Sequence, residues 1–263
     1  MPILVKTVIL PLAPETNRIK LQQLTKLTRR CTYAVELFLQ KARSKNLSSK
    51  KALEQFRHEV QAHTGLSSGF VQACRDRASW LVKAWENRID EWQNKVTKKE
   101  YVLRKASENR NHLQEQLADL SPQVIKTRIK KHHQVVSAEK QVNQLTHHVS
   151  QLNQLSPPFP TIRRRQPIWF DKRIGFLGKT KKLGCHFHYW LTISTLYKGK
   201  RLSLPIQVYP YAEQFLNSFE WKWKSFIIVW NRQQKRYFVH LKLEKQVAPK
   251  KLTDAWGVDL GMK

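Results

Sequence analysis

A carboxylate near the end of the sequence, Asp259, has the surroundings that best suit metal chemistry. It lies in Gly257-Val258-Asp259-Leu260-Gly261, where a short apolar strand would present one carboxylate at its edge. Carboxylate oxygens are preferred ligands of Mg²⁺, and the glycine that follows allows the backbone to turn without a Cβ clash. Hydrolysis of a phosphodiester with two metal ions needs more carboxylates than this one. Asp259 is therefore predicted to bind Mg²⁺ only where other acidic residues complete the site.

A second cluster combines cations with aromatic rings between residues 163 and 201. Eleven Lys or Arg residues lie there against a single acidic one, Asp171. They are Arg163, Arg164, Arg165, Lys172, Arg173, Lys179, Lys181, Lys182, Lys198, Lys200 and Arg201. Phosphate contacts need mobile cations, and unpaired bases favour flat aromatic faces such as that of Trp190. The cluster is predicted to bind nucleic acid, together with Arg75 and Arg77 from a helical stretch. The alternative for any single lysine is a solvated surface position.

Histidines and cysteines indicate little metal chemistry. His186 and His188 form a His-x-His pair that can hold a metal, but no third ligand lies nearby in the sequence. The three cysteines, Cys31, Cys74 and Cys185, are far apart, which argues against a disulfide framework and against a Cys-rich zinc site. Cys31 and Cys74 fall on apolar helical faces and are expected to be reduced core residues.

The charge of the whole chain favours a polyanionic partner. The 263 residues contain 48 Lys and Arg against 19 Asp and Glu, a formal net charge of +29. Positive charge in this excess opposes compaction unless a polyanion neutralises it, and nucleic acid is the usual one. The longest plainly apolar run, Phe226–Trp230, is far too short to span a bilayer, and the N-terminus lacks the plan of a signal peptide. We therefore expect a cytoplasmic protein with no membrane partner.

The elements that must position these residues begin with a strand and continue as helices. β-Branched residues at 3–12, bounded by prolines, predict the strand. An apolar spacing of three or four then predicts an amphipathic helix over 17–43 and a short one near 49–62. A long apolar stripe from Phe70 to Val96 follows and is expected to form the core of a helical bundle.

Residues 100–155 have a different pattern, in which apolar residues are spaced alternately by three and four. The apolar positions are Val135, Ala138, Val142, Leu145, Val149 and Leu152. This heptad seam predicts a helical hairpin or a short coiled coil. The stretch would project from the body, pair with a partner or pack along a nucleic-acid channel, and the pattern does not choose among the three.

After Ser156-Pro157-Pro158 the hydrophobic period changes from helical to two. Alternating segments at 185–194 and 202–209, and a second pair at 226–230 and 237–243, predict a small antiparallel barrel. The predicted fold class is therefore α+β. A helical domain is inserted into a small OB-like β-barrel, and the first strand of the chain completes that barrel by pairing with the later ones.

This order of elements resembles the N-terminal half of TnpB, the transposon-encoded RNA-guided DNA nuclease, and is similar to type V CRISPR effectors. The resemblance rests on Thr16–Arg43, Leu191–Val208, Lys235–Leu241 and Trp256–Gly261. It implies a wedge barrel and a helical recognition lobe that hold a guide RNA and its heteroduplex with target DNA. It also implies that Asp259 is the first carboxylate of a RuvC-like, RNase H-like site with two Mg²⁺ ions.

The resemblance divides the chain into four parts and predicts an incomplete nuclease. These parts are residues 1–13, the first barrel strand; 14–156, the recognition domain, with an unmatched coiled-coil-like insertion at about 97–155; 157–250, the barrel; and 251–263, the start of the nuclease domain. The other carboxylates of the family and its zinc-binding cysteines are expected beyond residue 263. Residues 1–263 are therefore predicted to bind guide RNA and DNA without cutting, as a truncated nuclease or as half of one that a second chain completes.

Two other hypotheses stay open. An unrelated basic RNA- or DNA-binding protein would explain the charge and the barrel, with the motif around Asp259 as a coincidence. An assembly protein would use the heptads between residues 113 and 152 for coiled-coil self-association. The RNA that accompanies the purified protein distinguishes the unrelated basic protein from the guide-binding one. The mass of the protein in solution tests the assembly protein.

Overall fold

The structure of the protein is a computed structural model that describes residues 2–121, 123–162, 164–180, 185–197 and 199–247. The chain divides into two compact units, Met1–Ser79 with Thr161–Lys263, and Trp80–Pro160. The elements, in chain order, are β1 (Ile3–Pro11), α1 (Arg18–Lys45), α2 (Lys50–Glu54), α3 (Arg57–Thr64), α4 (Ser68–Ala118), α5 (Ile125–Gln154), β2 (Ile168–Phe170), β3 (Gly175–Lys179), β4 (Tyr189–Ser194), β5 (Arg201–Ile206), α6 (Pro210–Asn217), β6 (Lys222–Asn231) and β7 (Arg236–Gln246).

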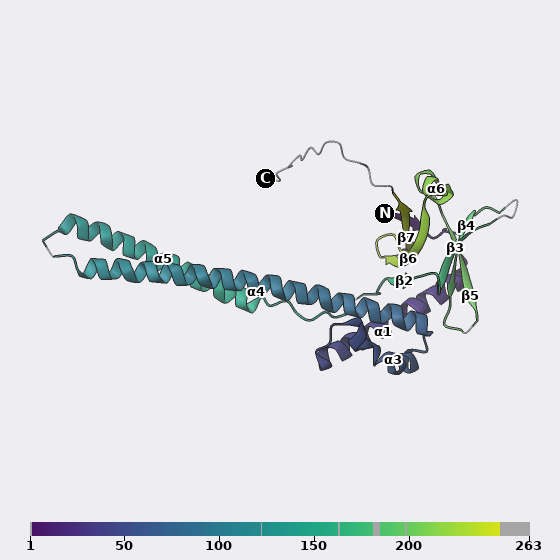
Figure 1. Cartoon of the computed structure of the whole chain (residues 1–263), viewed down its shortest axis with the longest axis horizontal. Coiled ribbons are helices and arrows are strands. Elements are labelled where there is room, and N and C mark those ends of the chain that lie inside the picture. Colours follow the sequence, from purple (N-terminus) through teal and green to yellow (C-terminus); the bar gives the residue numbers. More distant parts are fainter. Residues whose placement is uncertain (1, 122, 163, 181–184, 198, 248–263) are drawn as a thin grey trace. The chain divides into compact units, whose positions relative to one another are not determined.

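A four-stranded antiparallel sheet with the order β1-β7-β6-β2 forms the centre of the first unit. The strand predicted at the start of the chain is β1, and it pairs with β7 from Ile3 to Pro11, which confirms that it joins the later strands (Figure 1). Leu10 and Ile228 both lie opposite Val239, and all three side chains are buried. One face of this sheet is therefore the core of the unit.

A second, three-stranded antiparallel sheet has the order β3-β4-β5. It meets the first sheet at one corner, where Leu12 forms a bridge with Ile206. Among the described strands the two sheets do not form a closed barrel. The α+β class with antiparallel sheets is thus confirmed, while the closure predicted from the alternating pattern is not seen. An alternating pattern identifies the two faces of each strand, but it does not specify which strands pair.

The passage from β2 to β3 explains why the chain leaves the first sheet so early. Asp171 closes a tight turn, accepting a backbone hydrogen bond from Gly175 at 2.9 Å. Gly175 lies so close to the ring of Phe226 that a Cβ there would approach the ring to 2.6 Å. Only glycine fits this close packing, so the chain can turn directly against the buried face and start the second sheet.

Helix α1 and the first turns of α4 pack against the four-stranded sheet, through contacts such as Thr25 with Tyr237 and Phe70 with Phe170. Asn17 caps α1 by accepting a hydrogen bond from the backbone N–H of Ile19 at 2.7 Å. The ring of Phe70, near the start of α4, lies edge-on to that of Phe170 on β2, with 5.7 Å between ring centroids. The predicted helix at 49–62 is two helices, α2 and α3, because the chain turns where the Phe56 N–H bonds to the Leu53 carbonyl.

Cys31 on α1 and Cys74 on α4 are buried, free cysteines, as predicted. The Cys74 thiol donates a hydrogen bond to the Cys31 carbonyl oxygen at 3.5 Å. Burial raises the pKa of the Cys31 thiol well above its usual value. This thiol therefore stays protonated, which keeps it unreactive as a nucleophile.

The second unit is the helical hairpin predicted from the heptad pattern. The Trp92 indole donates to the Leu152 carbonyl oxygen at 2.9 Å, and Gln114 donates to Glu139 at 3.0 Å, so α4 and α5 run antiparallel side by side (Figure 1). The seam residues Val135, Ala138, Val142 and Val149 are buried within this single chain. The hairpin has no separate start at residue 97, because α4 continues without a break from Ser68 to Ala118.

None of the helices within the described residues has an apolar stretch long enough to cross a bilayer.

Candidate nucleic-acid interface

A hollow of about 780 Å³ lies in the first unit, between α1 and the hairpin that joins β6 to β7. Arg18, Lys26 and Arg29 line it from α1, where their spacing of eight and three places them on one face of the helix. Lys235 and Arg236 line it from the hairpin. Five cations from two distant parts of the sequence therefore converge on one hollow.

A second hollow of about 720 Å³ adjoins the first, and Trp230 lines both. Arg164 and Arg165 reach it from the segment that precedes β2, and Arg232 reaches it from the turn of the β6–β7 hairpin. The two hollows therefore adjoin at Trp230.

We call the cations of the two hollows the basic rim. The basic rim consists of Arg18, Lys26, Arg29, Arg164, Arg165, Arg232, Lys235 and Arg236. None of the described residues that line either hollow is an aspartate or a glutamate. Surfaces that serve solubility normally mix both signs of charge, so a rim of this composition suits a polyanion.

The geometry around Trp230 fixes part of the rim. The Arg165 guanidinium lies 5.3 Å from the Trp230 ring and donates a hydrogen bond to the Tyr237 hydroxyl at 3.2 Å. The Trp230 and Tyr237 rings meet edge to face at 4.8 Å between centroids. The Arg236 guanidinium donates to the Leu12 carbonyl oxygen at 3.0 Å. These two arginines are held in place, whereas Arg18, Lys26, Arg29, Arg164, Arg232 and Lys235 are exposed.

The β6–β7 hairpin presents its cations through a well-defined turn. The Asn231 side chain accepts a hydrogen bond from the backbone N–H of Gln234 at 3.1 Å. Lys235 follows with a φ of 48°, a left-handed conformation that completes the turn. The turn brings Arg232 and Lys235 to the rim from a single short loop.

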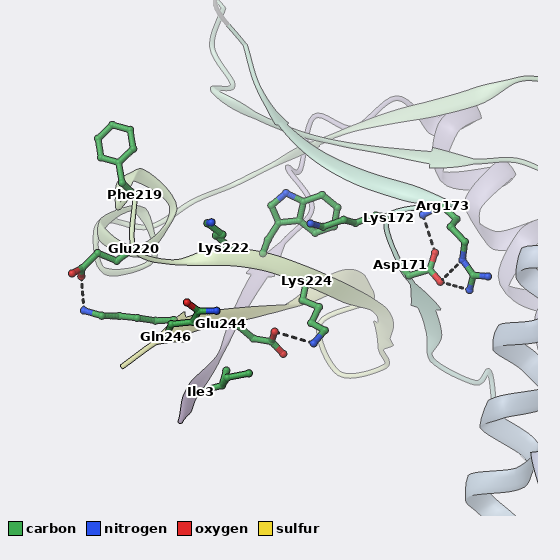
Figure 2. Close-up of a pocket in the computed structure, with 12 residues that line it drawn as sticks. Ile3, Asp171, Lys172, Arg173, Phe219, Glu220, Lys222, Lys224, Glu244 and Gln246 are labelled. Carbon is green, nitrogen blue, oxygen red and sulfur yellow. Dashed lines mark hydrogen bonds and ion pairs between the residues drawn. The ribbon is translucent and has the colours of Figure 1, made fainter. Parts of the chain in front are cut away.

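A third hollow, of about 810 Å³, contains Lys172 and Arg173 of the predicted cluster, but its charge is mixed (Figure 2). Arg173 pairs with Asp171, and this hydrogen bond lowers the pKa of that carboxyl group. Lys224 contacts Glu244 at 3.0 Å, and hydrogen bonds from Lys224 and Lys242 lower the pKa of Glu244. The carboxylates stay ionised and offset the cations, so this hollow is less suited to a polyanion than the basic rim.

The remaining described members of the predicted cluster lie on the three-stranded sheet and its turn. Trp190 on β4 is half buried, with the Lys20 ammonium 5.5 Å from its ring. Lys179 donates to the Asn217 side chain at 3.0 Å. Lys200 and Arg201 are exposed at the start of β5, beside aromatic rings. The structure therefore brings Arg164 and Arg165 to the basic rim and distributes the others over two further surfaces.

Arg75 and Arg77 make contacts within the protein. The Arg75 side chain is only 11% exposed and pairs with Glu54 and Asp76. Arg77 donates to the Gln166 side chain at 3.3 Å, and burial lowers the pKa of its guanidinium. These contacts connect the start of α4 to its surroundings, and they leave Arg75 little surface for a phosphate.

Five predicted residues lie outside the described part of the chain: Asp259, Arg163, Lys181, Lys182 and Lys198. Within the part that the structure describes, no three His, Cys, Asp or Glu side chains are grouped closely enough to hold a metal ion. His186 and His188 line a hollow of about 210 Å³ together with Glu15 and Glu213.

Sequence reasoning did not identify six members of the rim: Arg18, Lys26, Arg29, Arg232, Lys235 and Arg236. The three cations on α1 lie on one face of the helix, which the spacing in the sequence allows. In the sequence alone this face cannot be distinguished from an ordinary solvent-exposed one, because the β6–β7 hairpin beside it is distant in the chain. The signal available in the sequence was the hairpin loop Arg232-Gln233-Gln234-Lys235-Arg236, which contains three cations and no carboxylate.

No protein-family model matches the chain, and a search of curated proteins finds none that matches it.

Proposed function

We propose that this protein binds nucleic acid along the basic rim, as the part of a TnpB-like RNA-guided nuclease that holds guide RNA and target DNA. The alternative with the same chemistry is a basic RNA- or DNA-binding protein of other ancestry. Both versions use the same surface, and they differ in which nucleic acid occupies it.

The observation that carries the binding proposal is the composition of the basic rim. Eight Lys or Arg residues from three separate segments converge there, and no carboxylate lines either hollow among the described residues. Each cation that contacts a phosphate releases a counterion from the nucleic acid, which is a large part of the affinity of such proteins. The formal net charge of +29 adds attraction at longer range.

The family version is supported by the resemblance and by the pairing of β1 with β7. In the sequence, the helices and the other strands lie between these two strands, as expected for an insertion into one β domain. In this version the two sheets, joined at the Leu12–Ile206 bridge, correspond to a wedge-like barrel, and the helices belong to a recognition lobe. Asp259 contributes one carboxylate to a Mg²⁺ site that other residues must complete. The activity proposed for the described residues is binding of guide RNA and target DNA.

The test of binding is the salt dependence of the affinity for a fluorescein-labelled single-stranded RNA, measured by anisotropy. The rim variant combines Lys26→Ala, Arg29→Ala and Arg232→Ala, all at exposed positions. On a single strand, the slope of log K against log salt falls by about 0.7 for each phosphate that the protein no longer neutralises, so the expected change is up to about 2.

The matched control removes the same charge elsewhere, through Lys45→Ala, Lys51→Ala and Lys83→Ala, which are also exposed. Its slope should equal that of the unchanged protein. Equal losses in the two variants would mean that binding is spread over the whole surface and that the rim is not the site. Absence of binding by the unchanged protein at low salt would refute the proposed function.

The family version has its own test, which is to sequence the RNA that co-purifies with the protein from its native host. One abundant non-coding RNA encoded beside the gene is the expected result. If only ribosomal and transfer RNA accompany the protein, guide binding is excluded while non-specific nucleic-acid binding remains.

A further inference from the structure

The face of the four-stranded sheet opposite the core carries apolar and aromatic side chains that are partly exposed. Pairing places Ile9, His240, Ile227 and Trp169 in one row across β1, β7, β6 and β2. Ile9 is 48% exposed and Trp169 is 46% exposed. Phe238 lies two residues from His240 on the same face, since side chains alternate along a strand. This part of the sheet face is therefore largely apolar, where water-facing strands usually carry polar residues.

This row is long enough to take more than one flat group. Adjacent strands lie about 4.8 Å apart, so the four positions from Ile9 to Trp169 span about 14 Å. Trp169 and the half-buried His240 contribute rings to this row, and the Arg236 guanidinium lies 5.5 Å from the Phe238 ring. Burial lowers the pKa of His240 and so favours its neutral imidazole. A neutral ring stacks on an uncharged planar partner without the cost of desolvating an ion.

The charge beside the row identifies the kind of partner. Ile9, Phe238 and His240 line the same hollow as Arg164, Arg165 and Arg232 of the basic rim. Aromatic side chains can stack on the bases of a nucleic acid, and neighbouring cations without carboxylates can contact its phosphates. A surface with both features therefore suits a nucleic-acid strand. In a duplex the base faces are stacked on one another and are closed to such a surface.

We propose that this outer sheet face, with Trp169, His240 and Phe238, is a stacking platform for the unpaired bases of a single-stranded nucleic acid, whose phosphates lie on the adjoining basic rim. The proposal rests on the proposed nucleic-acid binding and adds to it the strandedness of the ligand and the residues that touch the bases. Trp169 stands at the open edge of the sheet, on β2, and contacts the base furthest from β1.

The test measures binding of a fluorescein-labelled oligouridine RNA and of a blunt RNA duplex of the same length. Trp169→Ala should weaken binding of oligouridine by about 5- to 150-fold, the range expected when one base no longer stacks. The slope of affinity against salt should stay unchanged, because no charge is removed. Binding of the duplex should be weaker from the start and should not respond to the substitution.

Two variants control for folding and for general removal of aromatic surface. Trp169→Phe keeps a ring at the position and should restore most of the affinity. Phe219→Ala removes a ring that is 99% exposed in the loop between α6 and β6 and should leave binding unchanged. Two results would contradict the proposed stacking platform. The Trp169→Ala variant would bind oligouridine as tightly as the unchanged protein, or it would lose as much affinity for the duplex as for oligouridine. With either result, a rim variant that still lowers the salt slope would leave the proposed function intact.

Discussion

The hydroxyl of Tyr237 on β7 lies 3.0 Å from the hydroxyl of Thr25 on α1. Tyr237 is 2% exposed, and the same hydroxyl accepts a hydrogen bond from Arg165 at 3.2 Å. One buried oxygen thus connects α1, β7 and the arginine segment before β2. This connection holds α1 beside the β6–β7 hairpin, where Arg18, Lys26 and Arg29 share a hollow with Lys235 and Arg236.

Tyr237→Phe tests this connection. The substitution keeps the ring and removes the hydroxyl, so Thr25, Arg165 and the buried Thr28 lose a partner. We expect the free energy of unfolding to fall by about 1–2 kcal/mol, the cost of a buried hydrogen bond that leaves unpaired groups behind. Urea denaturation measures it. Tyr197→Phe, at a position 62% exposed, is the control and should leave the midpoint unchanged.

The contribution of β1 to the core can be measured with two leucines of the same strand. Leu10 is completely buried, whereas Leu4 is 53% exposed. Leu10→Ala should destabilise the protein by about 2–5 kcal/mol, because it removes buried methyl groups and leaves a cavity. Leu4→Ala should change the stability by less than about 0.5 kcal/mol. Similar losses at both positions would contradict the difference in burial between the start of β1 and its end.

Neighbouring valines on α5 test the seam of the hairpin. Val135 is 6% exposed and Val136 is 47% exposed. Val135→Lys places an ammonium group in the apolar seam and should cost roughly 1–3 kcal/mol. Val136→Lys should be nearly neutral. Hydrogen exchange of the amides between residues 125 and 154 reports this locally. Faster exchange in both variants, or in neither, would contradict the seam.

His240 predicts a pH dependence of stability. Burial lowers its folded-state pKa below the unfolded value of about 6.5. The unfolded chain therefore binds more protons between the two pKa values, so the contribution of neutral His240 is complete above about pH 6.5 and is lost as pH falls below it. His240→Gln should flatten this decline in urea midpoints measured from pH 7 to pH 5. An equally steep decline in the variant would assign the effect to other groups.

Much of the fold could be predicted from local patterns in the sequence. The alternation in 226–230 and 237–243 predicted the strands that became β6 and β7, and the heptads between Val135 and Leu152 predicted the α4–α5 hairpin. Such patterns succeed because one face of each element must be buried, and this requirement repeats along the chain with the period of the element. They do not define where a helix stops against its neighbours, so α4 extends through the boundary placed at residue 97.

The basic rim shows what the sequence determined and what only the tertiary structure decided. The sequence alone determined an excess of cations, an aromatic-rich strand region and the identity of Arg164 and Arg165 as candidates. Only the tertiary structure decided that these two join Arg29 and Arg232, while Arg75 pairs with Glu54 and Lys172 lies among carboxylates. The reason is physical: the value of a cation to a ligand depends on the charges within a few ångströms of it, and those neighbours come from distant parts of the chain.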